Sequence, residues 1–165
     1  MKIILLLSAA LVAGFASPAL AQEHDHGEDA HHEASLGEVT VIHAWTRAAS
    51  AGEDAVVFFE VENGGDPVLL SGAEVENAAG AEIVGAQMAA SGDVAYEAIG
   101  SFTIPAGEFD FDPNGLGIRL NGLTETLEQG EHFHMHLLLD DGELEISVDV
   151  EAADATAHSH AGHAH

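Results

Sequence analysis

The sequence has 165 residues and is strongly acidic, with 29 Asp and Glu against 3 Lys and Arg, a formal net charge of −26, and no cysteine. This charge excludes nucleic acid and anionic membranes as partners, because both are bound by basic surfaces. The lack of cysteine excludes disulfides, thiolate zinc sites, blue-copper sites and iron–sulfur clusters. Cations and basic protein surfaces are the partners that such a composition favours.

The first 21 residues have the pattern of a secretory signal peptide. Lys2 precedes an apolar run from Ile3 to Phe15, and small residues lead to Ala21, after which the sequence becomes polar. The apolar run is shorter than the roughly 20 residues that span a bilayer, and no later segment approaches that length. We therefore expect a signal peptide at 1–21, export to the periplasm, and no membrane insertion after cleavage.

Two polar, histidine-rich segments flank the centre of the chain. Residues 22–35 and 152–165 contain no large apolar side chain, so neither buries enough surface to offset the entropy lost on ordering. We expect both to be flexible tails. The segment between them, residues 36–151, is long enough for one domain with its own hydrophobic core.

Within that domain, apolar residues recur with a period of two, which predicts half-buried strands. The predicted strands are 39–42, 55–61, 102–104, 109–111 and 144–150. Turn residues separate them, for example at 63–67, 112–115 and 140–142. No segment forms a convincing amphipathic helix. Short strands at this spacing predict an all-β fold, an antiparallel Greek-key β-sandwich.

Several short segments of the domain occur in a distinctive order. They are 41–48, the turn at 62–66, then 104–107, 113–115, 120–123 and 127–131. In this order they resemble the periplasmic copper(I) chaperone family called PCuAC, over nearly the whole domain. The resemblance implies a cupredoxin-like β-sandwich, export to the periplasm, and a copper-centre assembly protein or a respiratory oxidase subunit as partner.

The copper ligands of that family do not carry over to this sequence. The family holds Cu(I) through a His, a Met in the following segment and a His-x-Met, and its soft thioethers select Cu(I). The first His falls here at Val84 or Gly85, the His-x-Met falls at 117–119, and residues 93–97 contain no Met. Met88 alone does not make a site. The resemblance therefore predicts the fold and leaves the metal ligands to be found elsewhere.

Eleven of the twelve histidines fall in three clusters. Imidazole is the commonest protein ligand for borderline transition metals, so dense histidine clusters among carboxylates point to metal binding. The predicted ligands are His24, His26, His31 and His32 near the front; His132, His134 and His136 in a strand-like segment; and His158, His160, His163 and His165 at the end. His43 stands alone, and we expect it to be structural.

The internal cluster alternates with apolar residues. In a strand, Phe133, Met135 and Leu137 would face the core and the three histidines the opposite side, about 6.5–7 Å apart, which allows two imidazoles to reach one ion. Met135 would point away from that ion. This favours Cu(II) over Cu(I), with Zn(II) as an alternative, because no thioether joins the site. The competing interpretation is a polar outer face that happens to contain histidine.

Together these patterns predict a periplasmic, copper chaperone-like metal-binding protein that captures Cu or Zn through histidines and hands it on by ligand exchange. Two alternatives stay open. One is a metal-independent exported β-sandwich interaction module, whose acidity and histidines only keep it soluble; the other is a Zn or Ni buffer. The sequence contains no H-E-x-x-H, G-x-S-x-G, phosphate-binding glycine loop or EF-hand pattern. We therefore expect no enzymatic activity.

Overall fold

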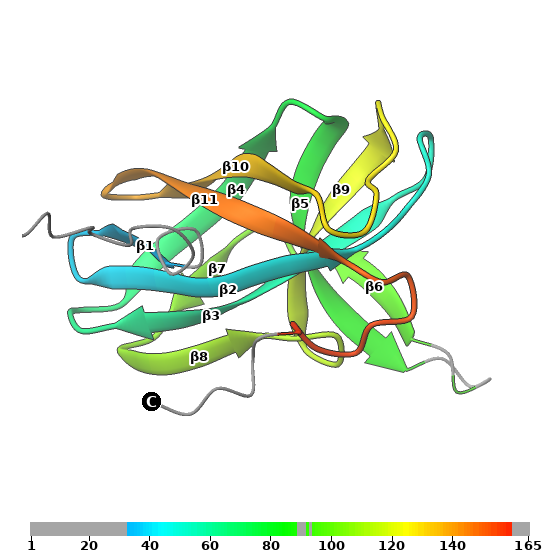
Figure 1. Cartoon of the computed structure of the whole chain (residues 1–165). Coiled ribbons are helices and arrows are strands. Elements are labelled where there is room, and N and C mark those ends of the chain that lie inside the picture. The colour runs from blue at the N-terminus through cyan, green and yellow to red at the C-terminus, as the bar shows by residue number, and fades with distance from the viewer. Residues whose placement is uncertain (1–32, 89–91, 93, 160–165) are drawn as a thin grey trace, which may run out of the picture.

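A computed structural model describes residues 33–88, 92 and 94–159 of the protein. These residues form eleven strands and no helix (Figure 1). The strands are β1 (Glu33–Leu36), β2 (Val39–Arg47), β3 (Ala55–Asn63), β4 (Val68–Val75), β5 (Ala78–Met88), β6 (Val94–Ala98), β7 (Phe102–Ile104), β8 (Gly107–Phe111), β9 (Leu116–Leu123), β10 (His132–Leu139) and β11 (Gly142–Glu151). The predicted signal peptide, residues 1–21, lies outside the described residues.

The strands form one hydrogen-bonded path in the order β6-β5-β9-β3-β2-β11-β10-β4-β7, with β1 added to β2 and β8 added to β3. Neighbouring strands are antiparallel, except that β11 runs parallel to β2. Strand β3 takes part in two sheets, because Ala55–Val57 pairs with β9 whereas Phe59–Asn63 pairs with β8. Figure 1 shows β5 and β9 crossing steeply past β2, β10 and β11. The predicted all-β sandwich is confirmed.

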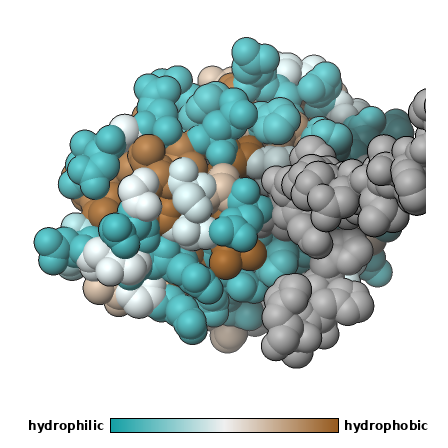
Figure 2. Space-filling view, turned by 60° about the vertical axis from the view of Figure 1, so that its left-hand side comes forward, coloured by the Kyte–Doolittle hydropathy of each residue, from teal (hydrophilic) through white to brown (hydrophobic). Residues whose placement is uncertain are grey.

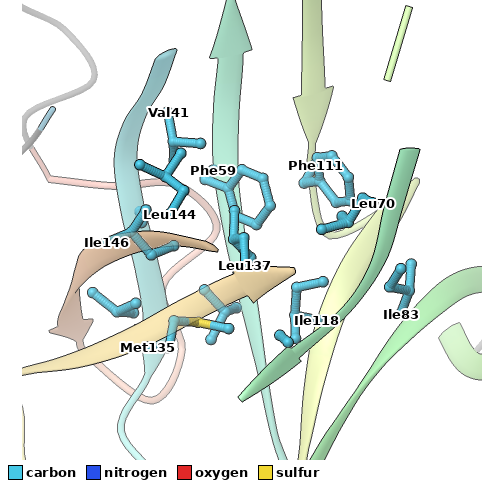
Figure 3. Close-up of a cluster of buried hydrophobic side chains, with 14 of the residues drawn as sticks. Val41, Phe59, Leu70, Ile83, Phe111, Ile118, Met135, Leu137, Leu144 and Ile146 are labelled. Carbon is cyan, nitrogen blue, oxygen red and sulfur yellow. The ribbon is translucent and has the colours of Figure 1, made fainter. Parts of the chain in front are cut away.

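The core lies between these layers and follows from the period of two. Along β11, Leu144, Ile146, Val148 and Val150 are buried, and the residues between them are exposed or half-buried. Met135 and Leu137 of β10 are fully buried in the same cluster (Figure 3). Each of these strands therefore has one apolar face in the core and one polar face toward solvent.

The polar side chains that alternate with the buried residues lie on the outer surface. On the face shown in Figure 2, hydrophilic side chains predominate, and apolar groups are visible between them. Such a mixture is ordinary for a folded domain, because a protein lacks enough polar surface to cover itself completely. Among the described residues there is no helix long and apolar enough to cross a membrane.

Trp45 is buried outside the main core. Its side chain is 6% exposed, and its ring centroid lies 5.1 Å from that of Phe58, which lies 6.3 Å from that of Tyr96. The guanidinium of Arg47 lies 5.7 Å from the Trp45 ring centroid. These residues form a separate aromatic cluster beside the C-terminal half of β2.

Residues on both sides of the predicted domain, 36–151, make contacts with the sheet. Strand β1 begins at Glu33, inside the predicted front tail, and pairs with β2. After Glu151, the segment 152–159 lies against the sheet, where Arg47 Nε donates to the carbonyl of Ala155 at 2.6 Å. The contacts of this segment are polar, so the hydrophobicity of the sequence gives no sign of them.

Candidate metal centre

The three histidines of β10, here called the β10 row (His132, His134 and His136), share one face of their strand. His132 and His134 are exposed and His136 is half-buried. Met135 and Leu137, on the opposite face, have no exposed surface. The alternation predicted from the sequence is confirmed, and the Met135 sulfur is directed into the core (Figure 3).

Carboxylates from both neighbouring strands flank the β10 row. Glu145 of β11 is the cross-strand partner of His136, with Glu145 Oε2 3.5 Å from His136 Nε2. The other carboxylate oxygen, Oε1, is 3.9 Å from His134 Nδ1. On the other side, Glu74 of β4 pairs with His136. One open cavity is lined by His134, His136 and these two glutamates.

His132 is at the end of the row. Its ring centroid lies 6.2 Å from that of His134, with the two rings nearly perpendicular. In the described part of the chain, no three His, Asp or Glu side chains are already arranged to hold a metal ion. His134, His136 and Glu145 must therefore rotate to converge on an ion. Side chains that are 43–60% exposed have room to do so, at a cost of about 0.5–1.5 kcal/mol each.

Position 117, where the resemblance to PCuAC places the His of the family's His-x-Met, is closed in this protein. Gly117 of β9 lies against β3, and a Cβ atom added there would be 2.5 Å from Val56 Cγ1 and 3.1 Å from Phe58 Cε1. Real Cβ atoms essentially never approach so closely, so no side chain fits without a shift of its neighbours. Val56 and Phe58 thus occupy the space that a side chain at position 117 would need.

Two residues further along β9, Arg119 forms an ion pair with Glu82. Arg119 Nη2 and Nε both donate to Glu82 Oε1, the latter at 3.1 Å, and Arg119 Nη1 donates to the Tyr96 carbonyl at 3.0 Å. These hydrogen bonds from Arg119, together with one from Asn121, hold the pKa of Glu82 below its usual value. Burial raises the pKa of Tyr96, whose hydroxyl donates to the Pro113 carbonyl. A fixed guanidinium here disfavours a metal cation.

His158 lies beside His43 and contacts Asp149, the cross-strand partner of His132. It is 5% exposed, and its Nε2 is 3.0 Å from Asp149 Oδ2 and 3.7 Å from Glu151 Oε1. Its ring stacks on that of His43, with centroids 5.5 Å apart. The other predicted tail ligands lie outside the described residues: His24, His26, His31, His32, His160, His163 and His165.

Sequence reasoning missed this pairing because it assigned His158 to a free tail and His43 to a structural role. One signal was present in the sequence. Asp149 and Glu151 alternate with apolar residues at the end of β11, which places both carboxylates on the outer face of the sheet. His158 follows Glu151 by seven residues and Asp149 by nine, which is close enough along the chain for it to contact both.

Comparison with solved structures identifies the fold. The apo PCuAC domain from PmoF1 is 27% identical, with a TM-score of 0.61 over 73% of this chain and 99% of that chain. The copper-bound PCuAC domain from PmoF2 is 25% identical, with a TM-score of 0.60 over 73% of this chain and 98% of that one. Copper(I)-DR1885 from Deinococcus radiodurans, at 24% identity and a TM-score of 0.54 over 68% and 77%, shares the fold. The protein is thus a β-sandwich of the PCuAC type.

The model of the LpqE-like family, which is provisionally described as a family of lipoproteins, matches residues 39–152. The chain belongs to this LpqE-like family. No curated protein matches the chain.

Proposed function

We propose that this protein is an exported copper-binding protein of the chaperone type, which captures Cu(II) at the β10 row and passes it on by ligand exchange. The observation that carries the proposal is the position of Glu145 between the imidazoles of His134 and His136. The fold supports it, because a PCuAC domain 25% identical to this chain has been solved with copper bound.

The donor atoms favour Cu(II) among the candidate ions. Imidazole and carboxylate suit borderline divalent metals, and the Irving–Williams order places Cu(II) above Ni(II) and Zn(II) for a given set of such ligands. The Met135 thioether, which would favour Cu(I), is on the opposite side of β10. Zn(II) is the alternative cargo of the same ligands.

The exposure of the β10 row suits transfer rather than storage. Two imidazoles and one carboxylate leave coordination positions that ligands of a receiving protein can enter. The net charge of −26 favours a partner with a basic surface, which we propose to be a copper-centre assembly protein or a respiratory oxidase subunit. The terminal histidines would raise the local concentration of imidazole around the site.

The proposal is tested by titrating the mature protein with Cu(II). Changing His132, His134 and His136 to Ala is expected to weaken the tightest Cu(II) binding detected by calorimetry by about tenfold or more. The matched control changes His160, His163 and His165 to Ala, which removes the same number of imidazoles from the end of the chain. It is expected to lose less than about threefold, since closely spaced histidines outside the β10 row offer many weak, equivalent chelates.

Equal losses in the two variants would contradict a specific site on β10. If the unmodified protein binds Cu(II), Zn(II) and Ni(II) no better than a scrambled acidic peptide, the chain is a metal-independent interaction module. If it binds Zn(II) or Ni(II) more tightly than Cu(II), it is a buffer for those ions.

A further inference from the structure

A second pair of histidines lines a cavity of about 170 Å³ between β2, β8 and the C-terminal segment. His43 and Trp45 of β2 contribute one wall and His158 another, while Glu60 and Asp110 add carboxylates. One strand, β11, separates this cavity from the β10 row, and Asp149 of β11, which contacts His158, is the cross-strand partner of His132.

The backbone at His43 is strained. The pairing of β2 with β3 shifts register between Ile42 and Trp45, and His43 has a φ of +52°, the only positive φ of a non-glycine residue in the described chain. This conformation costs an ordinary residue about 1–2 kcal/mol. Bulges of this kind redirect a side chain, and strained residues concentrate at functional sites. Here the bulge brings His43 Nδ1 to 3.9 Å from Glu60 Oε1.

His158 is fastened to the opposite wall by several polar contacts. Asp149 Oδ2 lies 3.0 Å from its Nε2, and the Ser159 amide and hydroxyl donate to Glu151 Oε1 at 2.8 and 2.7 Å. A carboxylate on one ring nitrogen is the arrangement that orients metal-ligating histidines, because it fixes the proton on that nitrogen and leaves the other as the donor. Asp149 would therefore make Nδ1 the ligating atom of His158.

The spacing of the two rings fits a shared ion. With metal–nitrogen bonds of about 2.1 Å, two imidazoles bound to one ion place their ring centroids about 5–6 Å apart. The centroids of His43 and His158 are 5.5 Å apart. The rings need to rotate from their stacked arrangement, and Glu60, which is 51% exposed, has room to turn inward as a further ligand.

We propose that His43 and His158 are ligands of a second metal site, with Glu60 as a further ligand, for a borderline divalent ion, Cu(II) or Zn(II). The surrounding carboxylates Asp110, Asp149 and Glu151 offset the charge of the ion. This site uses none of the three histidines of the β10 row.

Trp45 provides a reporter for the proposal, because it is the only tryptophan of the chain and lines the same cavity. Cu(II) quenches indole fluorescence at short range. The experiment titrates Cu(II) into the full mature chain in which His132, His134 and His136 are Ala, so that failure of the β10 proposal does not affect the result. Quenching is expected to saturate at about one equivalent.

Two further substitutions in that background remove one imidazole each. His43→Asn is chosen because Asn tolerates a positive φ, and His158→Gln because its amide can still donate to Asp149. Each is expected to raise the Cu(II) concentration needed for half-quenching by about tenfold or more. The control variant, with His160, His163 and His165 changed to Ala, is expected to match its parent.

Unchanged quenching in the His43→Asn and His158→Gln variants would overturn the proposal and leave the pair as a clasp that holds the C-terminal segment. A second measurement needs no substitution. In imidazole ¹H–¹⁵N spectra of the unmodified chain, stepwise Zn(II) is expected to shift the His43 and His158 resonances together. Signals that stay in place until the other histidines are saturated would also refute the site.

Discussion

Replacing Met135 by Ala is expected to lower the free energy of unfolding by about 2–5 kcal/mol and to leave Cu(II) affinity unchanged. Met135 has no exposed surface and packs among the apolar residues of both layers (Figure 3). Its removal leaves a cavity that a β-sandwich closes only in part. Urea unfolding gives the stability, and calorimetric titration of the folded protein gives the affinity.

Met135→Leu is the matched control, because leucine has a similar volume and no sulfur. We expect it to cost less than about 1.5 kcal/mol and to bind Cu(II) as the unmodified protein does. A Met135→Leu protein that keeps its stability but loses metal affinity would show that the thioether is a ligand. That outcome would contradict the assignment of Met135 to the core.

Substitution of Gly117 by His, the residue that the resemblance to PCuAC leads us to expect there, should destabilise the protein by at least about 1–3 kcal/mol without creating tight Cu(I) binding. The added Cβ would lie 2.5 Å from Val56 Cγ1. The χ1 rotamers of valine are restricted by its branched Cβ, so this side chain cannot relieve the clash by rotation. Arg119 would remain beside any ion, held by Glu82.

Two alanine variants separate crowding from the general effect of replacing glycine. Gly117→Ala is expected to be clearly less stable than the unmodified protein. Gly80→Ala, in β5, is expected to be neutral or slightly stabilising, because nothing lies within 4 Å of the added Cβ and alanine restricts the unfolded chain. Equal stability of these two variants in urea, or tight Cu(I) binding by Gly117→His, would refute the account of the closed pocket.

The strands with large alternating side chains were predictable from the sequence, and the small-residue strands were not. Residues 144–150 alternate regularly, and β11 extends over them with one or two residues added at each end. Strand β5, in contrast, contains four alanines and two glycines in eleven residues, a composition with weak strand preference. It forms because β9 and β6 pair with it on either side, which is tertiary information.

The candidate metal sites were also predictable from the sequence only in part. Alternation alone placed His132, His134 and His136 opposite Met135, because a strand sends neighbouring side chains to opposite faces. The register between β10 and its neighbouring strands decides which carboxylates face those histidines. This register places Glu145 and Glu74 opposite His136. The contact between His43 and His158 requires a bulge in β2 and a C-terminal segment held against the sheet. The alternation along β11 indicated the outward-facing carboxylates Asp149 and Glu151, and it indicated neither the bulge nor the path of that segment.

The most direct test of the account is X-ray absorption at the copper edge on the full mature protein loaded with one equivalent of Cu(II). The account predicts a first shell of nitrogen and oxygen atoms, with the outer-shell scattering that imidazole rings produce. A sulfur shell at about 2.3 Å, the distance typical of metal–sulfur bonds, would contradict it, because the metal would then be held by methionine.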